Sequence, residues 1–130
     1  MPLLIPISWG ELFDKITILE IKANRITEEI KLNNINNELH LLSGIADQVE
    51  KNTSELQEII SQLRMINEQL WDIEDEIRIC ESKKNFTARF IELARSVYIT
   101  NDKRAQLKYQ INQLLGSDLV EEKSYTHYKT

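Results

Sequence analysis

Apolar residues recur along this 130-residue chain in alternating steps of three and four positions, the spacing of one face of an α-helix. The repeat is cleanest between residues 54 and 81, where it runs through nearly four heptads. Its members are Leu56, Ile59, Leu63, Ile66, Leu70, Ile73, Ile77 and Cys80. A 3.5-residue period is typical of helices that wind around one another. The pattern therefore predicts a long helix over residues 54–81 that packs lengthwise against a neighbour.

The same spacing predicts three further helices, over residues 9–26, 28–51 and 86–115, and a tail over residues 117–130. The first of these helices is apolar on more than one side, which is typical of a helix at the centre of a bundle. The chain has only 3 Gly and 2 Pro, which argues against a many-stranded β fold. We therefore predict one all-α domain over residues 1–130, an antiparallel bundle of about four long helices with coiled-coil-like packing.

Three polar residues stand where helix N-caps are expected. Ser8 and Glu11 have the spacing of a capping box, in which the serine accepts a hydrogen bond from the N–H three residues on and the acidic side chain bonds back. Ser54 and Gln57 repeat this spacing. Asn85 is the expected N-cap of the last helix. These signals predict where three of the four helices begin.

The last helix has two possible forms. The unbroken apolar repeat favours one helix over residues 86–115 that ends at Gly116, a residue suited to the left-handed conformation. Alternatively, the poor helix formers of the segment Thr100–Asp102 interrupt it and start a fifth helix. The tail that follows either docks on the bundle through Tyr125 and Tyr128 or frays.

Charge is distributed unevenly along the chain. The net charge is −5 overall, with −4 over residues 1–50, −5 over residues 51–82 and +4 over residues 83–130. An acidic chain without a dense basic patch is not typical of a nucleic-acid-binding protein. The simplest interpretation is that an acidic helix packs beside a basic one, and the alternative is an anion site in the basic third. Long apolar helix faces of this kind often pack against the same face of a second chain, so we expect a homodimer.

The sequence lacks the common catalytic and phosphate-binding motifs, such as G-x-G-x-x-G and H-E-x-x-H. Cys80 is the only cysteine and falls on the apolar repeat, which predicts a buried thiol and excludes an internal disulfide. His40 and His127 are far apart in sequence, and we expect no metal site and no cofactor. No apolar run has the length of a membrane-spanning helix, so we expect a cytoplasmic protein that does not bind membranes.

The first candidate site is the helix face that carries Trp71, Glu74, Asp75 and Arg78. Glu74 precedes Arg78 by four residues, the order that favours an ion pair. Trp71 lies off the apolar repeat and must pack on something, because its large ring is costly to leave in water. The face is either a surface ion pair beside a tryptophan that covers another helix, or a recognition face for a partner or an anionic ligand.

The second candidate site is a polar gap in the last helix, where Thr100 and Arg104 occupy positions of the apolar repeat. A buried guanidinium keeps its charge and needs a carboxylate or phosphate partner. Either a neighbouring acidic residue such as Glu20 or Asp75 supplies that partner, or Arg104 receives a ligand anion in the bundle interior. The polar residues near Arg104 that would assist are Arg95, Asn101 and Lys108.

Several stretches spread over almost the whole chain form a fairly specific combination. They are Gly10–Lys22, Leu70–Arg78, Leu93–Tyr98, Thr100–Ala105 and Glu121–Tyr125. In these stretches the chain resembles a bacterial family of small all-helical proteins of unknown function. Members of that family tend to be encoded near glycosyltransferases of cell-surface polysaccharide synthesis, so the resemblance implies an accessory role there. It supplies no active-site residue to transfer.

Two functions remain open at this point. The first is a non-enzymatic interaction protein with a protein partner. It is favoured by the long apolar helix faces and by a sequence that lacks a recognisable nucleophile, metal site or phosphate loop. The alternative is a small all-α enzyme or binder that holds an anionic metabolite between Arg78, Arg95 and Arg104. The geometry that discriminates between them is whether Arg95 and Arg104 line one pocket with Trp71.

Overall fold

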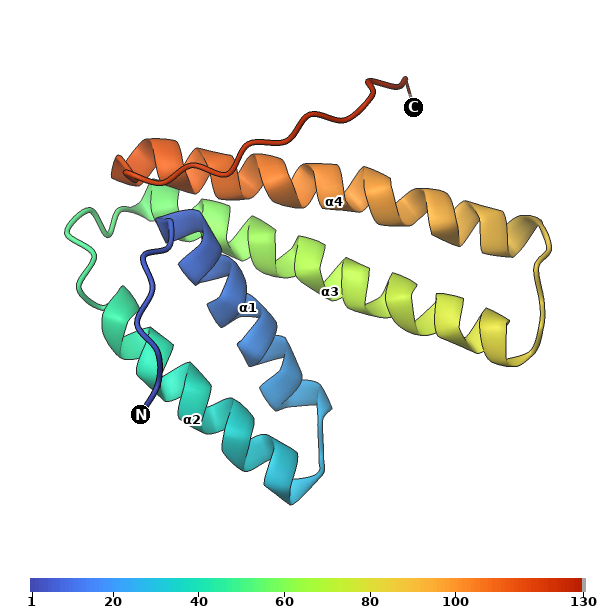
Figure 1. The fold of residues 1–130 in the computed structure, drawn as a ribbon, viewed down its shortest axis with the longest axis horizontal. Coiled ribbons are helices and arrows are strands. Elements are labelled where there is room, and N and C mark those ends of the chain that lie inside the picture. The colour runs from blue at the N-terminus through green and yellow to red at the C-terminus, as the bar shows by residue number, and fades with distance from the viewer. Residues whose placement is uncertain (130) are drawn as a thin grey trace.

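The computed structural model describes residues 1–129, which form four α-helices and no strand, and it confirms the all-helical prediction. The helices are α1 (Trp9–Arg25), α2 (Glu29–Ala46), α3 (Ser54–Ser82) and α4 (Ala88–Leu115). Helices α3 and α4 form a long antiparallel hairpin, and α1 crosses the end of the hairpin where α3 begins and α4 ends (Figure 1). Helix α2 packs against α1 on the side away from the hairpin (Figure 1).

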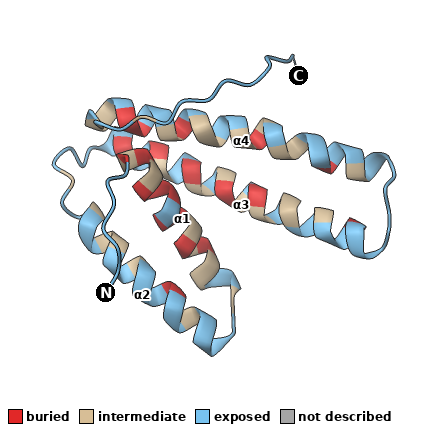
Figure 2. Ribbon diagram, in the orientation of Figure 1, coloured by how far each residue is buried: buried red, intermediate tan, exposed pale blue. Residues whose placement is uncertain are grey.

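The hydrophobic core lies where α1 crosses the hairpin. Buried side chains concentrate on α1 and on the adjoining parts of α3 and α4, whereas the far end of the hairpin and most of α2 are exposed (Figure 2). The core cluster consists of Leu12, Phe13, Ile16, Leu56, Ile59, Leu63, Leu107 and Ile111. Because α1 packs against all three other helices, its predicted central position is confirmed.

The start of α1 agrees with the sequence in part. The Ser8 hydroxyl accepts a hydrogen bond from the Glu11 backbone N–H at 3.1 Å, as the capping box predicts. The Glu11 carboxylate does not bond back to residue 8. It accepts a hydrogen bond from Lys108 of α4 instead, because an ammonium group from another helix competes for it.

The other two predicted caps were wrong by one or two residues. Thr53, not Ser54, caps α3, and its hydroxyl accepts from the Leu56 backbone N–H at 3.2 Å. Thr87, not Asn85, precedes α4, and its side chain makes no capping hydrogen bond. In both connections several polar residues follow one another, so spacing alone does not single out the residue whose extended backbone makes it the cap.

The ends of α2 and α4 settle two further predictions. Helix α2 ends at Ala46, earlier than the predicted residue 51, and a turn follows. Helix α4 is one uninterrupted helix, so the predicted alternative of a break at Thr100–Asp102 was wrong. Thr100 is buried within α4, and burial outweighs its low helix propensity. As predicted, Gly116 ends α4 in the left-handed conformation, with φ 61°.

Helix α1 approaches α4 very closely at Gly10. The Gly10 N–H donates a hydrogen bond to the buried Asn112 side chain at 2.7 Å. A Cβ atom on Gly10 would lie 2.4 Å from the Lys108 backbone oxygen, a distance that a side chain cannot occupy. Glycine is therefore required where the two backbones meet, and it fixes how α1 sits on the hairpin.

The tail runs back along α4 and docks near the middle of that helix through one of the two predicted tyrosines. The Tyr128 ring packs edge-on against Tyr98, with ring centroids 5.3 Å apart, and its hydroxyl donates to the Asp102 carboxylate. This hydrogen bond raises the pKa of Tyr128 to about 12. Tyr125 is exposed.

None of the helices formed by residues 1–129 has an apolar stretch long enough to cross a membrane.

Candidate functional site

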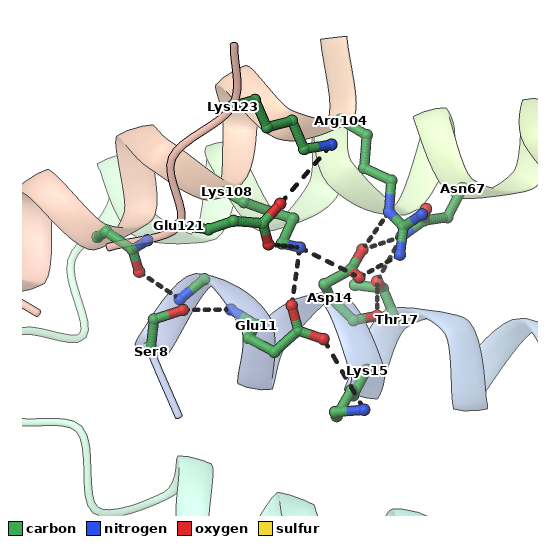
Figure 3. Close-up of polar contacts among 12 residues, drawn as sticks. Ser8, Glu11, Asp14, Lys15, Thr17, Asn67, Arg104, Lys108, Glu121 and Lys123 are labelled. Atoms are coloured by element: carbon green, nitrogen blue, oxygen red, sulfur yellow. Dashed lines mark hydrogen bonds and ion pairs between the residues drawn. The ribbon is translucent and has the colours of Figure 1, made fainter. Parts of the chain in front are cut away.

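A buried polar cluster joins α1, α3 and α4 around Asp14. The Arg104 guanidinium donates to both carboxylate oxygens of Asp14, with N–O distances of 2.9 and 2.5 Å. Asn67 of α3 donates to the same carboxylate at 3.0 Å and to the Thr17 hydroxyl at 3.0 Å. The Thr17 hydroxyl in turn donates to the Asp14 backbone oxygen (Figure 3). A carboxylate that is 1% exposed is thereby fully bonded.

The partner of Arg104 corrects the sequence prediction. Neither Glu20 nor Asp75 pairs with Arg104, because Asp14 of α1 provides both oxygens. Glu20 instead accepts from Arg64 at 2.7 Å. The hydrogen bonds that Arg104 donates to Asp14 raise the pKa of Arg104 above its ordinary value. The polar gap in the α4 repeat is therefore the place where α1 is bonded to the hairpin.

Lys108 extends this cluster toward the tail. Its ammonium group lies 2.8 Å from Glu11, 3.3 Å from Glu121 and 4.0 Å from Asp14 (Figure 3). Burial acts to lower the pKa of Lys108, but the hydrogen bond to Glu11 and the charges of Asp14 and Glu121 outweigh it. The pKa is raised as a result. Lys108 is thus a bonded cation that joins α1, α4 and the tail.

Beside the buried cluster, residues of α1, α3 and α4 line a groove of about 490 Å³. Its lining residues are Ile18, Asn67, Leu70, Trp71, Glu74, Asp75, Arg78, Asn101 and Arg104. The groove has apolar side chains from α1 and α3 together with several charged groups. We call it the Trp71 groove.

The structure brings six of the eight predicted site residues together in this groove. They are Trp71, Glu74, Asp75, Arg78, Asn101 and Arg104. Arg95 is exposed on α4 and does not line it. Lys108 lines a different hollow of about 220 Å³, between α4 and the tail. The two predicted sites therefore form one groove, without Arg95 and Lys108.

The charges of the Trp71 groove are mostly paired within the chain. Arg78 donates to Glu74 at 2.5 Å, the ion pair that the sequence predicts. Arg104 is bonded to Asp14 at the floor of the groove. Asp75 is the one charged lining residue that forms no ion pair among residues 1–129. The lining charge without an ion pair is therefore negative, and it acts on Arg25 of α1, whose pKa the charge of Asp75 helps to raise.

Trp71 is partly buried at the edge of this groove. The guanidinium of Arg25, from the end of α1, lies 5.8 Å from the centroid of its ring. Arg25 also donates to Asp72 at 2.5 Å, and this hydrogen bond raises its pKa. The tryptophan thus has packing from α1 on one side and contributes to the groove lining.

Comparison with protein families gives one match. A model described as a family of unknown function (DUF6165) matches residues 3–129. The chain belongs to DUF6165. Comparison with curated proteins and with solved structures finds no match. The family match covers the buried cluster and the groove but assigns no activity to this DUF6165 protein.

Sequence reasoning missed three members of the buried cluster around Arg104: Asp14, Thr17 and Asn67. Asp14 and Thr17 stand three residues apart inside the apolar first helix, and Asn67 lies between Leu63 and Leu70 of the α3 repeat. Polar residues within buried faces need partners, and the polar gap at Arg104 is the complementary signal. Matching these polar interruptions across helices would have suggested the cluster.

Among residues 1–129 of this DUF6165 chain, no group of three or more His, Cys, Asp or Glu side chains is placed to hold a metal ion. Cys80 is buried, as its position in the apolar repeat predicts.

Proposed function

We propose that this DUF6165 protein is a non-enzymatic interaction protein whose Trp71 groove binds a basic segment of a partner protein. The observation that carries the proposal is the unpaired carboxylate of Asp75 beside an aromatic ring in a partly apolar groove. A lysine or arginine of the partner satisfies Asp75, and its aliphatic stem packs on Trp71. An adjacent apolar side chain of the same segment fills the space between Ile18 and Leu70.

Charge favours this ligand over a small anion. An anionic metabolite needs free cationic groups, but Arg78 and Arg104 are already bonded to Glu74 and Asp14. Releasing either arginine would leave a carboxylate without its partner, and for Asp14 that carboxylate is buried. A basic ligand meets no such cost at Asp75.

Asn101 adds the hydrogen-bonding capacity that a peptide segment needs. Its amide lines the groove from α4, opposite the α3 residues, and is partly exposed. An amide both donates and accepts, so it suits the backbone of a bound segment.

The test uses two defined peptides and isothermal titration calorimetry. The first is a helical peptide with arginine flanked by leucine, and the second carries glutamate in place of arginine. We expect saturable binding of the basic peptide alone. Asp75→Asn should weaken it roughly tenfold or more, because a charge-assisted hydrogen bond is worth about 1.5–3 kcal/mol. Arg95→Gln, outside the groove, should leave the affinity unchanged.

The same titration includes phosphosugars, nucleotide sugars and dicarboxylates as small anions. Saturable binding of one of these, lost in Arg78→Gln, would replace the proposal with the metabolite-binding function. Absence of binding by the basic peptide, or binding that survives Asp75→Asn, would overturn the proposal directly.

The resemblance adds a biological setting to the proposal: a cytoplasmic accessory role in cell-surface polysaccharide synthesis. The expected result is that a deletion strain makes less surface polysaccharide and that the wild-type chain restores it. Asp75→Lys should fail to restore it although the protein accumulates normally, whereas Arg95→Gln should succeed. Full polysaccharide in the deletion strain would contradict this setting and leave the peptide test standing.

A further inference from the structure

The hairpin has a second hollowed face that shares no lining residue with the Trp71 groove. Two hollows, of about 310 and 390 Å³, lie between α3 and α4 and share Gln110. The α3 residues are Glu55, Ile59, Gln62, Met65, Ile66 and Gln69. The α4 residues are Lys103, Gln106, Leu107, Tyr109, Gln110, Gln113 and Leu114. We call this the glutamine face.

The glutamine face is poor in charge for this chain. Charged residues make up 28% of the sequence, but only Glu55 and Lys103 line the two hollows, and Glu58 lies beside them, where it accepts a hydrogen bond from Gln62 at 3.2 Å. Between them lie amides and apolar side chains, among them Met65 at 58% exposure and Tyr109 at 47%. A lining that is poor in charge and has exposed methionine and tyrosine is typical of a protein interface.

The composition of the glutamine face suits contact with the same face of a second copy of the chain. A symmetric dimer brings identical surfaces together, so each group must be complementary to itself or to a group that the two-fold axis places opposite it. A glutamine amide both donates and accepts, so one glutamine pairs with another. The five glutamines are Gln62, Gln69, Gln106, Gln110 and Gln113.

The two charges lie at opposite ends of the face. Glu55 is in the first turn of α3, and Lys103 shares a hollow with Gln69, about 21 Å further along that helix at 1.5 Å per residue. Gln62 lies midway between Glu55 and Gln69 in sequence. A two-fold axis through that midpoint exchanges the ends, so that Glu55 of one copy meets the partner's Lys103. Neither residue forms an ion pair within residues 1–129.

We propose that two copies of this chain pair antiparallel through the glutamine face, with a Glu55–Lys103 ion pair at each end. The dimer is a bundle of two hairpins, and it leaves both Trp71 grooves open on its outer sides. The inference goes beyond the partner-binding function and rests on a different surface, so each is testable without the other.

Analytical ultracentrifugation over a concentration series tests the proposal with charge reversals. Lys103→Glu and Glu55→Lys should each weaken the dimer about tenfold or more, because each places like charges opposite one another at both ends of the interface. The double variant Glu55→Lys/Lys103→Glu should restore the wild-type dissociation constant to within about threefold, because the swapped charges pair again. Lys83→Glu, the same charge change at the hairpin tip, should have no effect.

Met65→Arg places a charge at the centre of the face and should also give a monomer. Thermal unfolding followed by circular dichroism shows whether this variant still folds. A wild-type chain that is monomeric throughout the series would overturn the proposal. So would a dimer that resists the single reversals, or single reversals that the double variant does not rescue. A dimer lost in Asp75→Asn but not in Lys103→Glu would place the self-contact in the Trp71 groove instead.

Discussion

Helices α1 and α2 have similar sequence patterns but very different environments. Each has apolar residues in steps of three and four. Helix α1 buries eight residues and packs against all three other helices, whereas α2 buries only Ile35 and packs against α1. The periodicity of an apolar face thus shows that a helix has a buried side, but not how many neighbours it has.

Polar residues account for the difference. The acidic residues Glu11 and Asp14 of α1 bond to Lys108 and Arg104 of α4. In α2 the ion pair at the start of the helix is local, from Lys31 to Glu28 three residues away, and it is exposed. A helix whose polar side chains need partners on other helices is held at a defined place, because a misplaced helix would leave them unsatisfied.

The largest expected effect follows from removing the cation opposite Asp14. Arg104→Met should lower the free energy of unfolding by about 3 kcal/mol, because the Asp14 carboxylate is 1% exposed and loses both hydrogen bonds from the guanidinium, with only Lys108 at 4.0 Å left as a nearby cation. Lys31→Met in α2 should cost less than about 1 kcal/mol, since its ion pair is exposed. Urea denaturation of both variants measures the contrast.

The double variant Arg104→Met/Asp14→Leu is the control for that experiment. It should be more stable than Arg104→Met alone, because no buried charge remains unpaired. If Arg104→Met and Lys31→Met lowered the free energy of unfolding equally, the buried ion pair would not be what holds α1 in place.

A smaller loss is expected at the close contact between α1 and α4. Gly10→Ala should destabilise the protein by about 1–3 kcal/mol, because its Cβ would lie 2.4 Å from a backbone oxygen that cannot move independently. The thermal unfolding midpoint should fall accordingly. An unchanged midpoint would mean that the two helices separate without cost.

The equivalent change in α2 should have the opposite sign. Gly44 is exposed in that helix, and no atom lies within 4 Å of the position of an added Cβ. Gly44→Ala should therefore stabilise the protein by about 0.5–1 kcal/mol through the lower conformational freedom of the unfolded chain. The same thermal measurement tests it, and a loss of stability would indicate an unrecognised contact on the outer face of α2.

The smallest effect concerns pH. Because the pKa of Lys108 is raised in the folded protein, its contribution to stability is complete below the ordinary value of 10.5 and is lost as the pH rises through the folded pKa. Stability should fall more steeply in this alkaline range for the parent chain than for Lys108→Met. The comparison is made in a Tyr128→Phe background, since Tyr128 also titrates there, with a pKa of about 12. Parallel curves would contradict a role for Lys108 in holding α1.

Much of the fold was predictable because helix formation depends on near neighbours in sequence. The α3 repeat from Leu56 to Cys80 and the stop at Gly116 were both read correctly. The N-caps Thr53 and Thr87 were missed because backbone conformation, not residue type alone, decides between adjacent polar residues. The helix face with Trp71 and the gap at Arg104 were identified separately, but nothing in their spacing showed that they meet.

The local sequence specifies four helices, their apolar faces and a cation on α4, Arg104, that needs a carboxylate partner. It does not specify which carboxylate. Glu20 and Asp75 were as plausible as Asp14 until the helices were placed, because an ion pair between residues 90 positions apart depends on the crossing of α1 over the hairpin. That crossing is set by the close contact at Gly10 and the packing of the core. The groove beside Asp75 is lined by residues of α1, α3 and α4, so it forms only when these three helices are placed together.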